Sequence, residues 1–293
     1  MAGLEKKPLW LRRRLPPEGQ NKEVIQTLGE KGLHTVCVEA HCPNQLECFS
    51  KGTATFLLLG PNCTRACTFC VVKKLQAVPP DPEEPGQTAK AVAQLGLDFC
   101  VLTMVTRDDI PDGGAGHIAE TVSAVKEYCD GIGVEVLISD LGGKRTALQT
   151  VLFSVPEVLA HNIETVPRLY SKVRPQADYR RSLDLLSMAV EIQPDVVTKS
   201  GLMLGLGESK DEVLKSMDDL RAVKCGLLTL GQYLAPSELH HPVIDYIHPD
   251  DFAEYEQEAY SRGFSGVASA PFVRSSYNAG EMYNKAQGLR YKV

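Results

Sequence analysis

The chain has 293 residues, of which 43% are hydrophobic and 23% charged, so it can bury a large globular core without disulfides. Its formal net charge of −6 does not favour a polycation that coats nucleic acid, and no apolar run approaches the ~18 residues of a membrane span. The N-terminal residues lack the apolar core of a secretory signal, so a cytoplasmic protein is expected. In that compartment, nine cysteines indicate metal binding or catalysis more than disulfides.

The start of the chain, residues 1–20, is basic and rich in proline, and we expect it to be irregular. Its dense basic run, Arg12–Arg14, is either a solvated patch or a docking point for an acidic partner. A short helix is predicted from Asn21 to Lys31, with Asn21 as its N-cap.

Three cysteines follow at C-x4-C-x5-C spacing, namely Cys37, Cys42 and Cys48. The spacing is looser than that of common zinc hooks and supplies three thiols rather than four. Alone, such cysteines would most often be buried thiols or a partial zinc site. As ligands of an iron–sulfur cube they would need a partner on the fourth iron, for which His41 or a distant oxygen is a candidate.

Beyond residue 52, strand-like and helix-like runs alternate, which indicates βαβ units and a parallel sheet. The predicted strands are Thr53–Leu59, Leu97–Val105, Val134–Ser139, Val158–Asn162, Val196–Leu204 and Leu227–Leu234. The predicted helices are Gln87–Leu95, Gly116–Tyr128, Thr146–Val151, Asp178–Ile192, Ser209–Val223 and Asp250–Ser261. Six units fit an α/β fold of the partial (β/α)6 TIM-type barrel, because a full barrel needs ~250 residues for itself. We expect an N-terminal extension over 1–50, the barrel over 51–235 and a C-terminal extension over 236–293.

A second set of cysteines, Cys63, Cys67 and Cys70, has C-x3-C-x2-C spacing directly after the first predicted strand and a Gly-Pro break. These thiols should lie on a loop at the C-terminal end of a strand, the edge where α/β barrels build active sites. Three such thiolates can ligate three irons of one [4Fe–4S] cube and leave the fourth iron open to a substrate or cofactor. Structural zinc is the alternative, but it usually pairs two C-x2-C hooks.

This spacing, with Phe69 before the third cysteine, resembles that of the radical S-adenosylmethionine (SAM) superfamily. The resemblance implies that SAM chelates the open iron beside Phe69 and is cleaved to a 5′-deoxyadenosyl radical. It also implies SAM contacts at the strand ends: Thr106 near the methionine amino group, Asn162 and Glu164 on the ribose, and Arg181 on the carboxylate. Without it, Asn162 and Glu164 would be an ordinary strand-end cap and Arg181 an exposed helix residue.

Over nearly its whole length the chain resembles the lipoyl synthases. The motifs that carry this resemblance are Lys7–Arg12 (KPLWLR), Thr35–Cys37, Cys42–Asn44, Glu47–Cys48, Leu59–Gly60, Cys63–Arg65, Thr106–Asp109 (TRDD), Asp112–Ala115, His161–Val166 (HNIETV), Lys199–Gly201, Gly205–Glu208 (GLGE), Gly231–Leu234 (GQYL) and Val273–Tyr277 (VRSSY). An ordered set of motifs is far more specific than any one of them. One departure is Val38, where the family commonly carries an acidic residue.

The resemblance assigns the first cysteine set to an auxiliary [4Fe–4S] cluster, whose fourth iron is held by a serine of the RSSY motif, here Ser276. Serine is a hard, weak ligand for iron, which suits a cluster that must come apart. In this family, sulfurs from that cluster enter C6 and C8 of an octanoyl chain amide-linked to a lysine of a lipoyl carrier domain. A radical is needed because unactivated C–H bonds have no acidic proton.

The implied partners are octanoylated carrier domains (dehydrogenase E2 subunits and the glycine cleavage H protein), an electron donor such as ferredoxin or flavodoxin, and an iron–sulfur carrier. Nucleic acid and membranes are not expected as partners, and a monomer is expected. Two rival functions are a methylthiotransferase acting on RNA, which would call for an appended basic module, and a non-catalytic iron–sulfur carrier, which would not need the SAM-contacting strand ends. Cys100, Cys129 and Cys225 are given no role, with Cys100 expected in the core.

Overall fold

The computed structural model describes residues 7–12 and 21–288. The irregular start expected over 1–20 and two arginines of the basic run, Arg13 and Arg14, therefore lie largely outside the described residues. The first predicted helix is present as α1 (Lys22–Glu30). Asn21 occupies its N-cap position, although its side chain makes no capping hydrogen bond.

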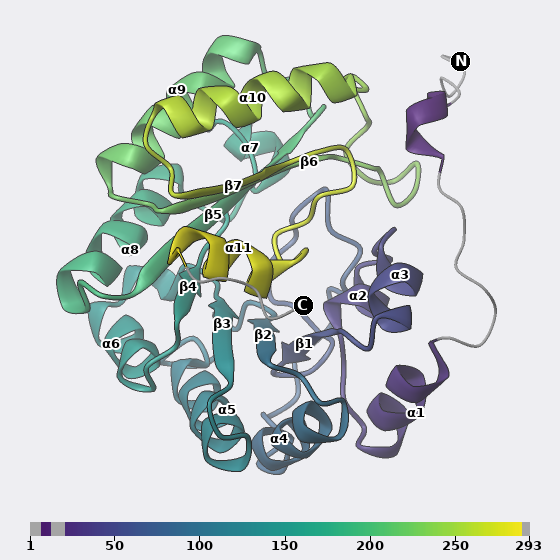
Figure 1. The fold of residues 1–293 in the computed structure, drawn as a ribbon, viewed down its shortest axis with the longest axis vertical. Coiled ribbons are helices and arrows are strands. Elements are labelled where there is room, and N and C mark those ends of the chain that lie inside the picture. Colours follow the sequence, from purple (N-terminus) through teal and green to yellow (C-terminus); the bar gives the residue numbers. More distant parts are fainter. Residues whose placement is uncertain (1–6, 13–20, 289–293) are drawn as a thin grey trace.

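The sheet has seven strands, all parallel and arranged in sequence order from β1 at one edge to β7 at the other (Figure 1). They are β1 (Thr55–Leu58), β2 (Phe99–Met104), β3 (Gly133–Leu137), β4 (Val158–Ala160), β5 (Val197–Leu204), β6 (Leu227–Gln232) and β7 (Gly266–Ser269). The first six match the predicted strands to within two residues at each end. The sequence did not predict β7, because its four small or β-branched residues lack a strand-length apolar pattern.

The sheet curves into a partial barrel of the TIM type, as predicted (Figure 1). Within the described residues β1 and β7 do not pair with each other, so the barrel has a lateral opening between its two edges. The segment expected as a C-terminal extension thus adds a seventh strand to the same sheet, beside β6.

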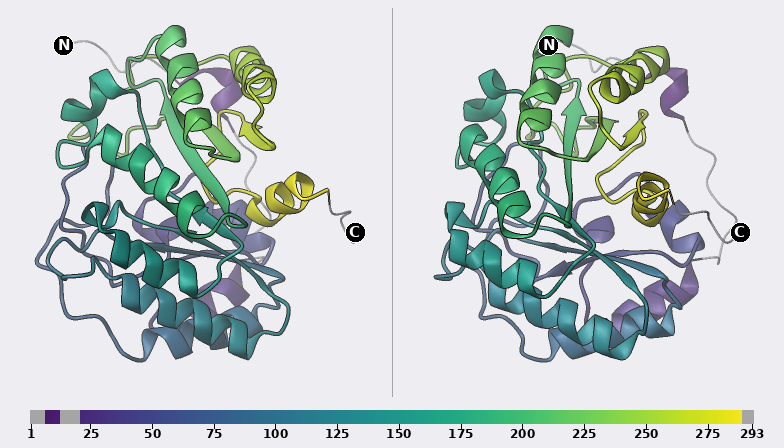
Figure 2. Two further views of the ribbon diagram at one scale, coloured as in Figure 1. Left: turned by 90° about the vertical axis from the view of Figure 1, so that its left-hand side faces the viewer. Right: turned by 60° about the vertical axis from the view of Figure 1, so that its left-hand side comes forward.

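The helices that follow the strands cover the outside of the sheet (Figures 1 and 2). They are α4 (Glu84–Gln94), α5 (Ala115–Tyr128), α6 (Arg145–Phe153), α8 (Tyr179–Ile192), α9 (Lys210–Ala222) and α10 (Pro249–Ser261), with the short turns η1 (Leu9–Leu11), η2 (Leu141–Gly143), η3 (Pro167–Leu169) and α7 (Tyr170–Val173) between or before them. Several of these helices have a side-chain N-cap. In α9, Ser209 and Glu212 form a reciprocal capping box. None of the described helices is long and apolar enough to cross a membrane.

The core that packs on the sheet is largely apolar, and Cys100 on β2 belongs to it as expected, with no exposed surface. A charged pair is also fully buried. Lys199 on β5 lies with its Nζ 2.8 and 2.9 Å from the two carboxylate oxygens of Glu135 on β3, and neither side chain is exposed. Such a pair is tolerated only when each partner satisfies the other, because an unpaired buried charge is very costly.

The two extensions cover the lateral opening of the barrel. On the N-terminal side, α2 (Val36–Glu39) and α3 (Gln45–Ser50) follow a short antiparallel bridge between Thr35 and Phe56 at the free edge of β1. On the C-terminal side, α11 (Ala279–Ala286) contacts both β7 and β2, with the ring of Tyr283 5.8 Å from that of Phe99 (Figure 1).

The extensions are also joined directly to each other. The Asn44 side-chain amide donates to the Phe272 carbonyl at 2.7 Å, and the Tyr277 hydroxyl donates to the Glu47 carboxylate at 3.0 Å. The residues that flank the first cysteine set are therefore fixed against the segment that contains Ser276.

Candidate active site

A cavity of about 560 Å³ opens at the C-terminal ends of the strands. It is lined by residues that follow β1 to β6, by the loop after α2 and by the VRSSY segment. Eleven of the twelve residues singled out from the sequence border it: Cys37, Cys42, Cys48, Cys63, Cys67, Phe69, Cys70, Thr106, Asn162, Glu164 and Ser276. The fold thus brings both cysteine sets, which are separate in sequence, to one space.

The loop of the second cysteine set is held by hydrogen bonds from several elements. The backbone amide and hydroxyl of Thr64 both donate to the Thr106 carbonyl, at 3.1 and 2.9 Å. The Ala66 amide donates to the Gln176 side chain at 2.6 Å, and the Thr68 amide donates to the carbonyl of Val173 at 3.0 Å. The loop therefore has a defined shape set by the protein alone.

The corner between β1 and this loop is fixed by charged side chains. Leu59 has a φ of 70°, which is unfavourable for a residue with a side chain. Glu84 accepts from its amide at 2.9 Å and Arg107 donates to its carbonyl at 3.3 Å. Gly114 makes room for it, since a Cβ there would lie 2.4 Å from a Leu59 methyl group. Arg107 of the TRDD motif and Gly114 of the DGGA motif therefore stabilise this corner of the backbone.

Burial raises the pKa of several thiols in both sets, to about 11 for Cys37 and to about 12 for Cys48 and Cys70. Neighbouring thiols of the same set add to the rise, because a second negative charge would lie close by. These cysteines therefore keep their protons at neutral pH in the metal-free chain. Ligation of a metal or cluster must release those protons.

The donor set fits iron–sulfur clusters better than zinc. Within residues 7–12 and 21–288, no three His, Cys, Asp or Glu side chains converge closely enough to hold one metal ion. A zinc ion needs its ligands on one small tetrahedron, with Zn–S bonds of ~2.3 Å. A [4Fe–4S] cube instead takes each thiolate on a different iron. Three thiols per set, all bordering one cavity, suit the second arrangement.

Polar groups without protein partners also border the cavity, close to the second cysteine set. Asn162 and Glu164 follow β4, and Glu164 has a φ of 63°, held by backbone bonds to Gly201 and Met203 on β5. Burial raises the pKa of the Glu164 carboxyl, and nearby Arg174 and Asn162 oppose that rise. In the described part of the chain, Asn162 Oδ1 and Arg174 Nε are buried with no hydrogen-bond partner. Buried polar atoms without partners call for an explanation, and a polar ligand in the cavity that both residues border would satisfy them.

Arg181 is the exception among the residues predicted from the sequence. It is not among the residues that line this cavity, and its Nε donates instead to Asp140 at 2.8 Å. One arginine that does border the cavity is Arg174, whose side chain also donates to the carbonyls of Asn162 and Ile163. Sequence reasoning missed Arg174, because a lone arginine after a short helix carries no recognisable signal.

The VRSSY segment reaches the cavity because β6 makes room for it. A Cβ on Gly231 would lie 2.0 Å from the Val273 carbonyl oxygen, so only glycine allows this close approach. Next to it, the Gln232 amide donates to the Pro271 carbonyl at 3.2 Å. The GQYL motif therefore serves to seat the segment that carries Ser276.

We expect Gly231→Ala to push this segment outward, because the new methyl group would overlap the Val273 carbonyl. Ser276 would move with the segment. A displacement of about 1 Å at a reacting group can lower a rate on the order of a hundredfold. In the reaction that the sequence resemblance implies, sulfur insertion should fall accordingly while 5′-deoxyadenosine still forms, which chromatography of both products would measure. Gly226→Ala is the control, because the nearest atom to a Cβ there is the Ser265 hydroxyl, at 3.4 Å. An unchanged ratio of the two products in Gly231→Ala would contradict the seating role.

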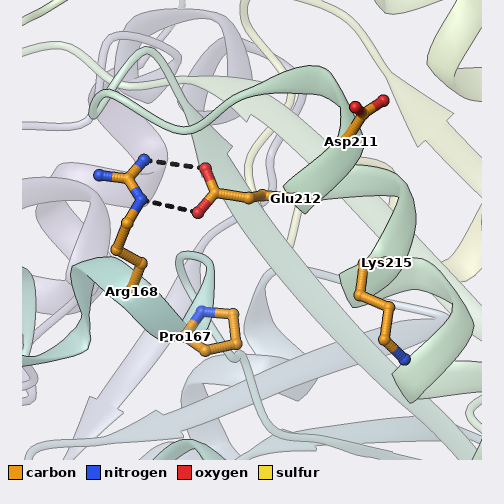
Figure 3. Close-up of a pocket in the computed structure, with 5 residues that line it drawn as sticks. All are labelled: Pro167, Arg168, Asp211, Glu212 and Lys215. Carbon is orange, nitrogen blue, oxygen red and sulfur yellow. Dashed lines mark hydrogen bonds and ion pairs between the residues drawn. The ribbon is translucent and has the colours of Figure 1, made fainter.

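A second, shallow surface pocket of about 340 Å³ lies between η3 and α9 (Figure 3). It is lined by Pro167, Arg168, Asp211, Glu212 and Lys215. Arg168 and Glu212 form a two-bond ion pair of 2.7 and 2.8 Å across it, so their charges are already satisfied. The pair joins two helical elements on the outside of the barrel, and we assign it a structural role.

The partial barrel and its thiol-lined cavity define a class of enzyme. The family model of the Radical SAM superfamily matches residues 57–220, which is more than half of the chain. Solved structures share the fold. HydG, a maturase of the [FeFe]-hydrogenase, has a TM-score of 0.58 at 13% identity, over 91% of this chain and 67% of that one. SuiB of Streptococcus suis, bound to S-adenosylmethionine, has a TM-score of 0.57 at 12% identity, over 75% and 52%.

Within this class, the chain belongs to the lipoyl synthase family. The lipoyl synthase of Caldicellulosiruptor bescii is 53% identical over 274 residues, which is 94% of each chain. That of Alkaliphilus metalliredigens is 49% identical over 288 residues, covering 98% of this chain and 99% of the relative. The activity is therefore a radical SAM sulfur transfer that uses two [4Fe–4S] clusters and SAM. Two sulfur atoms, taken from the auxiliary cluster, enter C6 and C8 of an octanoyl-lysine on a lipoyl carrier protein.

Proposed function

We propose how the residues of this chain divide the family's reaction. Cys63, Cys67 and Cys70 hold the cluster that binds SAM. A second group holds the auxiliary cluster: Cys37, Cys42, Cys48 and Ser276. The observation that carries this assignment is the single cavity that both cysteine sets and Ser276 border. A radical formed on one side can serve a sulfur donor on the other only if both share one enclosed space.

When bound, the first cluster supplies the electron that cleaves SAM and the second supplies sulfur. The chain's own part is to bind, orient and enclose. Asn162 Oδ1 would accept from a ribose hydroxyl and Arg174 Nε would donate to the SAM carboxylate, because both atoms are buried beside the cavity without partners among the described residues. Glu164 would take a second ribose hydroxyl, Thr106 would lie near the methionine amino group, and Phe69 would pack beside the cofactor. We favour Arg174 over Arg181 for the carboxylate because Arg181 is engaged by Asp140.

Apolar side chains that border the cavity would keep water and stray hydrogen donors from the radical. Leu57 and Val72 border the cavity and are 3% and 7% exposed. Tyr233 borders it as well, and its hydroxyl is occupied by a 2.7 Å bond to the His241 carbonyl. A hydroxyl whose proton is held in a hydrogen bond suits a site in which a radical must not abstract hydrogen from the protein.

The carriers served would be dehydrogenase E2 subunits and the glycine cleavage H protein, in the cytoplasm. The reductant would be a ferredoxin or flavodoxin, and an iron–sulfur carrier would rebuild the auxiliary cluster between turnovers. We keep a division into an auxiliary-cluster part over 1–50, a barrel over 51–235 and a part with the RSSY motif over 236–293. The enzyme would act as a monomer, without nucleic acid or membrane.

The test is a mass measurement on a reconstituted enzyme. Protein loaded with iron and sulfide under anaerobic conditions is given SAM, a strong reductant and an octanoyl-lysine peptide. The peptide should gain two sulfurs with loss of two hydrogens, or appear as the reduced dithiol. An unchanged peptide with free 5′-deoxyadenosine would leave the SAM cleavage site in place and overturn the substrate assignment. No 5′-deoxyadenosine from cluster-loaded protein would favour a carrier of clusters instead.

Ser276→Ala tests the auxiliary ligand in the same assay. Loss of the fourth ligand should stop sulfur insertion, while SAM cleavage continues because its cysteines are untouched. Ser275→Ala is the matched control, since Ser275 also borders the cavity and adjoins it in the same segment. Full dithiolane yield from Ser276→Ala would remove this serine from the site.

A further inference from the structure

Arg65 is the one buried residue of the Cys63–Cys70 loop, although it carries a charge. It lies between Cys63 and Cys67, and its side chain is only 6% exposed. Its guanidinium donates to both oxygens of Asp108, at 2.7 and 2.8 Å, and to both oxygens of Asp140, at 2.9 and 2.7 Å. Two-bond contacts of this kind fix the planar guanidinium in direction as well as in distance.

The two carboxylates come from different strand ends. Asp108 follows β2 and Asp140 follows β3, so one side chain joins the cysteine loop to two neighbouring strands of the barrel. Asp140 is itself held by the Arg181 guanidinium at 2.8 Å and by the Gly142 amide at 3.1 Å. Arg181 lies on α8, so the chain of contacts continues from the loop to the outer layer of helices.

The network is electrically balanced, with two arginines and two aspartates. Burial alone would raise the pKa of Asp140, but the bonds and charge of Arg65 hold that pKa well below its usual range. With two positive and two negative side chains, the formal charges of the network cancel. The network is suited to hold a loop in place more than to impose a field on the cavity.

We propose that Arg65 is a positioning residue that shapes the Cys63–Cys70 loop before any cluster is bound, with Asp108, Asp140 and Arg181 as its anchors. The proposal rests on the assignment of Cys63, Cys67 and Cys70 to the SAM-binding cluster. It gives Arg181 a part in the site through Asp140, without contact to SAM. The cluster then enters a cage whose thiols already have their final directions, which spares the ordering cost of the loop.

The first test uses the full chain without clusters. Hydrogen exchange should report on the amides of Thr64, Ala66 and Thr68, each of which is bonded outside the loop. In Arg65→Gln these amides should exchange roughly tenfold faster or more, while amides of β2 and β3 stay within about twofold of the parent protein. Arg65→Lys should recover part of the protection, because an ammonium can still meet one carboxylate.

Two arginines on α8 give a matched pair. Arg181→Gln should loosen the loop to a smaller degree than Arg65→Gln, because Asp140 keeps its other partners. Arg180→Gln should change nothing, since the Arg180 side chain is 81% exposed and pairs with Asp184 on its own helix. Equal loop protection in Arg65→Gln and the parent would overturn the proposal, as would a loss spread evenly over the barrel.

The second test loads the same variants with clusters. Arg65→Gln should raise the KM for SAM about tenfold or more and alter the SAM-induced change in the electron paramagnetic resonance of the reduced cluster. Arg180→Gln should do neither. If the loop loosens in the first test while the KM and the spectrum stay those of the parent, the positioning role is overturned. If variants of Cys63, Cys67 and Cys70 still cleave SAM, the cluster assignment is overturned instead. The hydrogen-exchange result would not be affected by that outcome.

Discussion

Replacing Cys63, Cys67 and Cys70 together by alanine should abolish 5′-deoxyadenosine while about half of the iron stays bound. The reason is that these thiols border a part of the cavity shared with Asn162, Glu164 and Arg174. The other set would keep its cluster, because Asn44 and Glu47 hold it against the C-terminal segment independently of this loop. Iron analysis and chromatography of the nucleoside measure the two halves of the prediction.

The reciprocal triple replacement, of Cys37, Cys42 and Cys48 by alanine, should give the opposite outcome. SAM cleavage should continue and the peptide should gain no sulfur, again with about half of the iron. Cys129→Ala serves as the control for loss of a thiol as such, because Cys129 is partly exposed and does not border the cavity. SAM cleavage at the parent rate in the first triple variant would refute the assignment of the loop.

Lys199→Met should destabilise the folded chain severely. It leaves the fully buried Glu135 without its partner, and breaking one side of a buried pair typically costs about 3–5 kcal/mol. That is a large part of the ~5–15 kcal/mol that holds a domain folded. Denaturant unfolding of the cluster-free chain, followed by circular dichroism, would measure the loss of free energy.

Two comparisons separate an unpaired charge from a simple cavity. The double variant Lys199→Met with Glu135→Leu should recover most of the stability, because it removes both charges at once. The single variant should also lose less stability at lower pH. Burial already raises the pKa of Glu135, and the replacement removes the Lys199 charge that opposes that rise. The folded state then binds a proton that the unfolded chain releases above its ordinary pKa, so stability increases as pH falls through the raised pKa. Equal loss in the single and double variants would refute the account.

The sequence alone predicted those features of the fold and site that depend on residues close together in the chain. Strand and helix alternation predicted six strands and the barrel, because buried parallel strands are short apolar runs between helices. Cysteine spacing predicted the cluster at Cys63, Cys67 and Cys70, whereas the cluster at the first cysteine set came from the family resemblance. The role of Ser276 came from family resemblance, since no local pattern distinguishes it from any serine in a loop.

What escaped prediction depends on which side chains the fold brings together. Arg174 reaches the cavity and Arg181 does not, although both follow β4 and neither lies in an obvious motif. Arg65 lies between two cysteines of the motif, but its role could not be predicted because its partners Asp108 and Asp140 are 43 and 75 residues away in the sequence. β7 was missed for another reason, as its short sequence is a strand only because β6 and α11 lie beside it.

The bond between Asn44 and Phe272 joins residues 228 positions apart, and that between Glu47 and Tyr277 joins residues 230 apart. Translation proceeds at ~5–20 residues per second, so on the order of ten to fifty seconds pass between synthesis of the first cysteine set and of the segment that closes over it. During that interval the three thiols have been made, but their cover has not. On the assignment proposed above, the auxiliary cluster can gain its serine ligand and its cover only when the chain is nearly complete.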